Sequence, residues 1–186
     1  MKILLINKFH YRKGGAETVY FDTADIFIKQ GNDVHFFSTK NKENVECNDE
    51  KYFIKYRDYS KGHGFFKNVK SFLNMLYSFE AKRNLKRMIK DVGPFDVAYL
   101  HNIYHQISPS IIKVLKKNNI KVIMVVHDLK LMCPNYKMVN GKNELCEKCK
   151  GGKYYNCVKY KCVKNSFAAS LACTIESYFH KFIKAY

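Results

Sequence analysis

Apolar and polar positions follow one another along the first forty residues in the order strand, loop, helix, strand. A short apolar run at Ile3–Ile6 leads into a polar loop that ends in two adjacent glycines. Apolar residues at helical spacing follow from 16 to 30, and Gly31 is a typical C-terminal stop. A second apolar run covers Val34–Phe37. This order is typical of the unit that builds a parallel sheet with helices on its faces.

The rest of the chain continues the alternation of helices and strands. The pattern predicts a short strand near 52–54, helices over 65–90, 109–117 and 166–185, and strands over 96–100 and 121–126. We expect the last of these strands, KVIMVV, to be buried, because apolar β-branched runs are typical of parallel sheets. The elements predict an α/β fold with a doubly wound, mainly parallel sheet and a cysteine-rich loop insertion at 129–165.

Ligands of doubly wound sheets bind beyond the carboxyl ends of the strands. The strand over 96–100 is followed by His101, Asn102 and His105, and the strand over 121–126 by His127 and Asp128. Three histidines and an acid at one edge favour a functional site over simple packing. A structural role remains open for each of them.

The loop after the first strand has a feature of its own, the pair Gly14 and Gly15. Adjacent glycines leave backbone N–H groups accessible, and the helix that follows presents a partial positive charge, which together suit a phosphate. A plain strand-to-helix turn explains the pair equally well. Neither G-x-G-x-x-G nor a P-loop is present, so we expect neither a dinucleotide site nor a P-loop nucleotide site.

Length and composition narrow the class of protein. With 186 residues, 47% of them hydrophobic, the chain is long enough for one well-cored domain over 1–186. Its longest apolar runs fall short of the roughly 18 residues of a membrane span, and its start does not resemble a signal peptide. We therefore expect a cytoplasmic protein whose seven cysteines are reduced unless a metal holds them.

The net charge of +17 is concentrated in two tracts, residues 61–90 and 129–165, each with a net charge of +7. Such tracts predict an anionic partner, either a phosphorylated ligand, an acidic membrane surface or a nucleic acid. The predicted helix over 65–90 adds an apolar stripe that includes Phe65, Phe66 and Phe79 to a basic face of Lys67, Lys70, Lys82, Arg83, Lys86, Arg87 and Lys90. It either lies on the inner face of an anionic membrane or packs on the sheet with its basic face in solvent.

Five cysteines fall within thirty residues, with the spacing C-x(12)-C-x(2)-C-x(7)-C-x(4)-C: Cys133, Cys146, Cys149, Cys157 and Cys162. A CxxC pair with further cysteines nearby is typical of a structural zinc site, and a metal would stabilise a segment that has little core of its own. An iron–sulfur cluster and buried reduced thiols are the alternatives. The basic, tyrosine-containing segment also resembles small zinc modules that bind nucleic acid, but its position directly after the His127 strand argues against that partner.

Three segments together resemble the N-terminal domain of family 4 glycosyltransferases, which have the GT-B arrangement of two facing Rossmann-like domains. They are KGGAE at 13–17, AYLHNIYHQISPS at 98–110 and VVHDLKLMCPN at 125–135. The resemblance covers almost the whole chain in the right order. It implies a retaining transfer of a sugar from a nucleotide-sugar donor to a cell-envelope polysaccharide or a lipid-linked acceptor, without a catalytic metal.

The resemblance also implies roles for individual residues. Gly14 and Gly15 would face the donor diphosphate, and His127, beside Asp128, would lie near the reacting sugar. Glu17 either contacts this ligand or complements the positive end of the helix dipole. The acceptor would contact a further set of residues, namely His101, Asn102 and His105.

Family members carry a second domain that binds most of the donor, and this chain does not contain it. We therefore expect either a C-terminal domain or a partner chain to supply the donor site, and little activity from this chain alone. One alternative is a non-catalytic subunit that anchors or regulates a separate donor-binding chain. The other is the zinc-containing nucleic-acid-binding module considered above.

Overall fold

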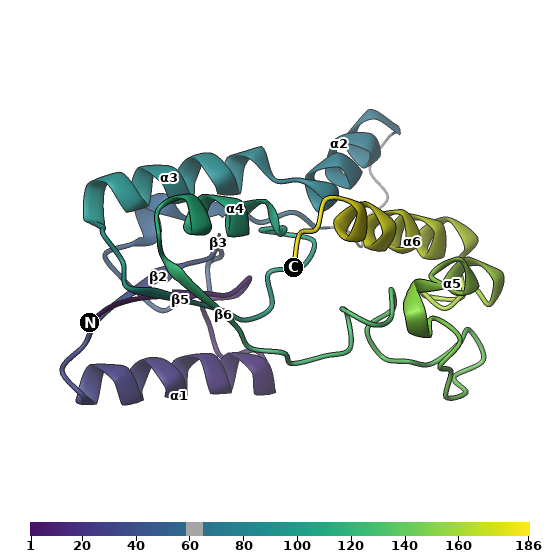
Figure 1. The fold of residues 1–186 in the computed structure, drawn as a ribbon, viewed down its shortest axis with the longest axis horizontal. Coiled ribbons are helices and arrows are strands. Elements are labelled where there is room, and N and C mark those ends of the chain that lie inside the picture. Colours follow the sequence, from purple (N-terminus) through teal and green to yellow (C-terminus); the bar gives the residue numbers. More distant parts are fainter. Residues whose placement is uncertain (59–64) are drawn as a thin grey trace. The chain divides into compact units, whose positions relative to one another are not determined.

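A computed structural model gives the structure of residues 1–58 and 65–186, without the side chains of residues 65–68 and 70. The chain forms two compact units, unit 1 over Met1–His127 and unit 2 over Asp128–Tyr186 (Figure 1). Each unit has its own buried residues and is described separately.

Unit 1 is built on a four-stranded parallel sheet with the order β2-β1-β5-β6. The strands are β1 (Lys2–Ile6), β2 (Asp33–Phe37), β5 (Val97–Leu100) and β6 (Lys121–Met124). Ile6 pairs with Phe37 on one side and Leu100 on the other, and Leu100 pairs with Met124. The strands therefore end level with one another, and the loops after them begin at one edge. This confirms the predicted α/β class with a parallel sheet.

Helices cover both faces of the sheet (Figure 1). They are α1 (Gly15–Lys29) on one face, and α3 (Phe79–Val92) and α4 (Ser110–Lys117) on the other. Because successive strand residues point to opposite faces, Leu4 and Leu100 pack in a core with Leu85 of α3, whereas Leu5 packs with Tyr20 of α1. Both cores fix the sheet edge from which the loops emerge.

The predicted helix over 65–90 is wrong as a single element, because it is two helices, α2 (Phe65–Leu76) and α3. Ser78 separates them: its Oγ accepts a hydrogen bond from the N–H of Ala81 and so caps α3. The Ser78 N–H donates to Ser108 Oγ, and the Ser78 carbonyl accepts from Ser110 Oγ. The side chains of four residues assigned above to this amphipathic helix lie outside the described part: Phe65, Phe66, Lys67 and Lys70.

The prediction that the strand over 121–126 is buried is also wrong. β6 ends at Met124 and is an edge strand, with Ile123 43% exposed. Apolar composition reports the strand itself but not its place in the sheet. The strand predicted near 52–54 lies slightly later, as β4 (Ile54–Lys55), which pairs with β3 (Thr39–Lys40) after a short 3₁₀ turn, η1 (Glu50–Tyr52).

Unit 2 contains the cysteine-rich segment and the last helix. Its elements are η2 (Lys150–Gly152), α5 (Tyr155–Lys159) and α6 (Phe167–Phe182), with a bridge between Val139 and Leu145. The helix predicted over 166–185 is thus present as α6, whereas α5 lies inside a segment predicted to be a loop. The buried apolar residues of unit 2 are few, namely Cys133, Cys149, Tyr154, Cys157 and Ala185.

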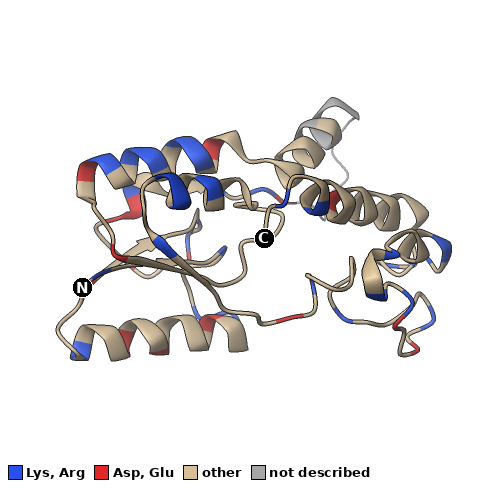
Figure 2. Ribbon diagram, viewed as in Figure 1, with Lys and Arg blue, Asp and Glu red and all other residues tan. Residues whose placement is uncertain are grey.

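The charges of unit 1 divide between the two helical layers (Figure 2). Helix α3 carries five Lys and Arg against Glu80 and Asp91, whereas α1 carries mainly Glu17, Asp22 and Asp25. No helix in the described ranges, 1–58 and 65–186, is long and apolar enough to cross a membrane.

Candidate functional site

The residue after β1, Asn7, ties the first loop to the loop after β5. Asn7 is fully buried, and its Oδ1 accepts a hydrogen bond of 3.1 Å from the N–H of Asn102. The Lys8 N–H donates to the Asn102 carbonyl at 3.0 Å, and the His101 N–H donates to Ile6 at 2.8 Å. These bonds extend the β1–β5 ladder beyond the strands and hold the two loops side by side.

The same asparagine reaches the start of α1. Its Nδ2 donates to the carbonyl of Phe9 at 2.9 Å and to Glu17 Oε1 at 3.3 Å. Glu17 is 5% exposed and lies in the first turn of the helix, where a carboxylate complements the partial positive charge of the helix end. Its burial and its bond to Asn7 favour this role over contact with an anionic ligand.

Gly14 and Gly15 are exposed at the N-terminus of α1. Gly14 is the N-cap without a side-chain capping bond, so first-turn N–H groups lack partners within the helix, as at any helix start. A Cβ at Gly15 would meet no atom within 4 Å, and one at Gly14 would lie 3.6 Å from Glu17 Oε2. Beside them the ammonium of Lys13 lies 4.0 Å from the centre of the Phe9 ring.

His101 and His127 lie in direct contact. Their Nδ1 and Nε2 atoms are 2.8 Å apart, and the rings are stacked with centroids separated by 5.0 Å. His101 is 2% exposed, and burial, together with the neighbouring His127, lowers its pKa to about 4. His101 is therefore neutral at pH 7 and carries a single ring N–H.

The position of that proton follows from the surroundings of His101. Its Nε2 is buried and has no hydrogen-bond partner among the described residues. A buried N–H without an acceptor is rarer and costlier than an unpaired acceptor. We therefore assign the proton to Nδ1, which donates to His127 Nε2. A neutral His127 then carries its own proton on Nδ1, so the pair sets which nitrogen of His127 is the donor.

A second layer of polar side chains lies behind the histidine pair. The Tyr20 ring packs edge-on against His101 with centroids 5.3 Å apart, and its hydroxyl lies 3.0 Å from His10 Nδ1. Burial lowers the pKa of His10 to about 4, although Asp49 opposes the shift, and burial raises the pKa of Tyr20. Sequence reasoning missed this layer and the role of Asn7. A polar residue directly after an apolar strand was the available signal for Asn7.

His105 and Asp128 differ from the residues above. His105 lies in the turn after Asn102, with a φ of 62°, and its ring is half-buried. Asp128 is the first residue of unit 2, and its Oδ1 accepts a hydrogen bond of 2.9 Å from the Lys130 N–H. The Asp128 carboxylate therefore stabilises a turn of the backbone at 128–130.

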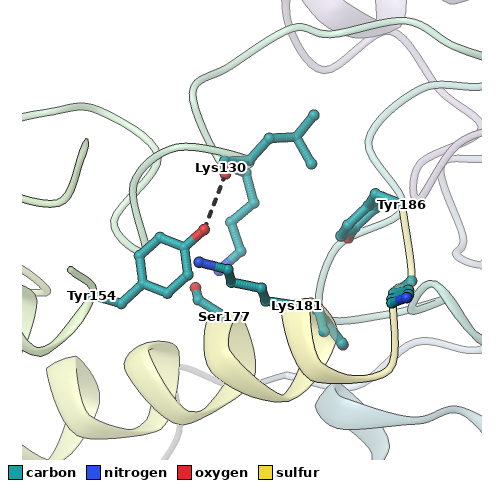
Figure 3. A pocket seen from close by; sticks show the side chains of 9 residues that line it. Lys130, Tyr154, Ser177, Lys181 and Tyr186 are labelled. Carbon is teal, nitrogen blue, oxygen red and sulfur yellow. Dashed lines mark hydrogen bonds between the residues drawn. The ribbon is translucent and has the colours of Figure 1, made fainter. Parts of the chain in front are cut away.

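Unit 2 contains a pocket of about 380 Å³ (Figure 3). It is lined by Lys130, Leu131, Tyr154, Ser177, His180, Lys181, Lys184, Ala185 and Tyr186. Among these residues Lys130 is buried, and its ammonium pairs with the buried carboxylate of Glu176. Burial by itself would lower the pKa of Lys130, but Glu176 outweighs it and raises this pKa, so Lys130 is charged and already neutralised. The exposed lysines of the pocket wall are Lys181 and Lys184.

The cysteines of the predicted metal site also lie in unit 2. Cys133 Sγ donates a hydrogen bond of 3.2 Å to Asn135 Oδ1. Cys149, Cys157 and Cys162 lie in one cluster with Tyr154. Within residues 1–58 and 65–186 no three His, Cys, Asp or Glu side chains have the arrangement of a metal centre. The thiols are therefore neighbours that do not take up ligand geometry in this structure.

Comparison of the chain with protein-family models, with curated proteins and with solved structures gives no match in any of the three.

Proposed function

We propose that unit 1 is the acceptor-side, Rossmann-like half of a GT-B glycosyltransferase that uses a nucleotide-sugar donor. One observation carries the proposal: the contact between His101 and His127 lies at the sheet edge where Asn7 also holds the glycine loop. Transfer of a sugar from a diphosphate needs groups that orient the sugar and groups that stabilise the leaving phosphate. The His127 imidazole, which His101 holds in place, suits the first task, and the accessible backbone N–H groups suit the second. The sequence resemblance to family 4 enzymes points the same way.

The chemistry assigns each part a task. As the bond to the leaving diphosphate breaks, negative charge grows on the phosphate oxygens and positive charge on the sugar ring. The N–H groups at Gly14 and Gly15, with the Lys13 ammonium nearby, would stabilise the leaving group. His127, held by His101, would donate a hydrogen bond to a sugar hydroxyl and orient the ring. Asn102 and His105 would contact the acceptor.

A second domain or a partner chain would bind most of the donor and close the site. A glycan or a lipid-linked acceptor would enter from unit 1. In this proposal the chain works in the cytoplasm, at the inner face of the membrane that carries the acceptor.

The junction of α2 and α3 supports attachment to such a membrane. Phe79 is 73% exposed beside the ring of Tyr77, and Lys82 and Arg83 follow on the next turn. An exposed aromatic ring next to basic side chains suits an anionic lipid surface. Cosedimentation with anionic vesicles at low salt should occur, and Phe79→Ser with Lys82→Glu should reduce it. Lys116→Glu, an equal charge change on α4, should have a smaller effect; failure of the unmodified chain to sediment would refute the attachment.

Amide NMR of the chain titrated with pyrophosphate tests the phosphate site. We expect shifts confined to the amides of residues 13–17, and similar shifts with a nucleotide-sugar. Gly15→Ala should weaken binding without unfolding the protein, because its Cβ meets nothing in the free chain. Lys29→Ala, at the opposite end of α1, is the control. Shifts that are absent, or that centre elsewhere, would disprove phosphate binding at this loop.

Sugar transfer is tested with the donor-binding half supplied, as a longer natural protein or as a second chain. His127→Ala should lower turnover on the order of 10²-fold with little loss of donor affinity, because His127 orients the reacting groups. His105→Ala is expected to act on acceptor KM instead. If turnover with His127→Ala equals that of the parent, His127 has no place in the reaction, and a non-catalytic anchoring role becomes the better account.

A further inference from the structure

Unit 2 is unusual in what occupies its centre. Of its five buried apolar residues, three are cysteines, Cys133, Cys149 and Cys157, and a cluster around Tyr154 adds Cys162. A unit of 59 residues with so few buried aliphatic side chains gains little stability from packing. Small domains of this kind depend on disulfides or metals, and all seven cysteines of this chain are free thiols.

Four thiols interact with one another in every combination. Cys149, Cys157 and Cys162 lie in one cluster with Tyr154, and the buried Cys133 interacts electrostatically with all three. Three short stretches of chain bring them together: the turn around Cys133, the residue before η2, and α5 with the turn after it.

Cys146 differs from this group although it belongs to the CxxC pair. It is half-buried, and its N–H pairs with the carbonyl of Met138 next to the Val139–Leu145 bridge. Its interactions include the exposed Lys148 and Tyr160 as well as Cys162. The spacing of the motif predicts Cys146 as a zinc ligand as strongly as the other cysteines. Its contacts in the structure set it apart from the other four.

We infer that Cys133, Cys149, Cys157 and Cys162 bind one zinc ion that holds unit 2 together. Tetrahedral ligation at about 2.3 Å requires sulfurs about 3.8 Å apart. The four thiols are not arranged as ligands in the metal-free structure, so their sulfurs must move into tetrahedral positions around the ion. Binding requires all four groups as thiolates and leaves a complex of net charge −2. The surrounding lysines offset this charge, among them Lys148, Lys150, Lys153, Lys159 and Lys161.

Metal analysis of the full chain, purified with a thiol reductant and without chelator, tests the inference. We expect one zinc ion per chain. Replacement by Co²⁺ should give the visible absorption of tetrahedral cobalt together with thiolate-to-cobalt charge transfer. Removal of the metal should speed hydrogen exchange in peptides from residues 128–186 far more than in those from 1–127. A folded, reduced protein that contains no zinc and takes up no cobalt would overturn the site.

Single substitutions test the choice of ligands. Cys149→Ser and Cys157→Ser should lose most of the bound metal, whereas Cys146→Ser and Cys47→Ser should retain it. A ligand variant that unfolds would lose metal for that reason alone, so the two control variants are needed as a second test. Loss of metal from Cys146→Ser would overturn the assigned set. Alkylation of the unreduced protein counts the free thiols, and disulfides between the four in a metal-free protein would likewise refute the inference. None of these readouts depends on sugar transfer.

Discussion

The two units reach a folded state by different means. In unit 1, fully buried aliphatic side chains such as Leu4, Leu85 and Leu100 pack on both faces of a hydrogen-bonded sheet. In unit 2, the buried residues include three thiols and the ion pair of Lys130 with Glu176, and none is a leucine, isoleucine or valine. An aliphatic core tolerates changes that conserve volume, whereas a buried ion pair leaves an uncompensated charge when one partner is lost. The second unit should therefore be much more sensitive to single changes of charge.

The largest expected effect is the loss of the buried ion pair of unit 2. Glu176→Gln leaves the Lys130 ammonium buried without a countercharge and should cost about 3–5 kcal/mol of stability. Urea unfolding followed by hydrogen exchange in peptides from 128–186 measures it. Glu147→Gln, which breaks the exposed pair with Lys150, is the control and should cost at most about 1 kcal/mol. Equal costs for the two variants would contradict the difference between buried and exposed pairs.

The corresponding change in unit 1 is Leu100→Ala. Leu100 is fully buried in β5, so the cavity should cost about 2–5 kcal/mol, seen in peptides from 1–127. Leu145→Ala removes the same atoms from a side chain that is 89% exposed and should change stability by less than about 0.5 kcal/mol. A small effect at Leu100 would mean that the sheet of unit 1 is not packed as described.

Acid should weaken unit 1 through two buried histidines. The pKa of His10 and of His101 is about 4 in the folded protein, below the usual 6.5. Between pH 6.5 and pH 4 the unfolded chain binds more protons, so stability falls as the pH falls. The slope should be at most about 1.4 kcal/mol per pH unit for each histidine. Urea unfolding at pH 7 and pH 5 measures the loss, and His101→Gln should reduce it. Stability that does not fall at pH 5 would argue against the buried, neutral state.

The smallest effect compares two helix caps. Ser78 caps α3 in unit 1 and Ser166 caps α6 in unit 2, each through its Oγ. Ser78→Ala should cost about 1–2 kcal/mol and Ser166→Ala about 0.5–1 kcal/mol, because the Ala81 N–H that loses its acceptor belongs to a fully buried residue. Chemical denaturation of both variants gives the comparison. The reverse order would contradict the dependence of the capping bond on burial.

Local patterns predicted most elements of unit 1. The apolar run at Ile3–Ile6, the helix stop at Gly31, whose φ is 76°, and the strand end before His101 all follow from periodicity and turn chemistry. The break at Ser78 was missed because the residue that would complete a capping box is Ala81, so the local signal is weak. The edge position of β6 was missed because strand order is decided by the whole topology.

The candidate site was predictable only in part. Parallel strands that end level explain why residues after different strands meet, and this placed His101 and His127 at one edge. The hydrogen bond between them, the link through Asn7 and the layer formed by Tyr20 and His10 depend on side-chain packing across the fold. In unit 2, the pairing of Lys130 with Glu176 joins residues far apart in the chain, which no local pattern reports.

The open space at Gly15 has a practical use. A side chain added there meets no neighbouring atom, so a cysteine introduced as Gly15→Cys would carry a fluorescent dye at the mouth of the loop. Its emission would report the approach of a second domain to that edge. Fluorescence from this one position would therefore detect an assembly step that leaves no other spectroscopic signal.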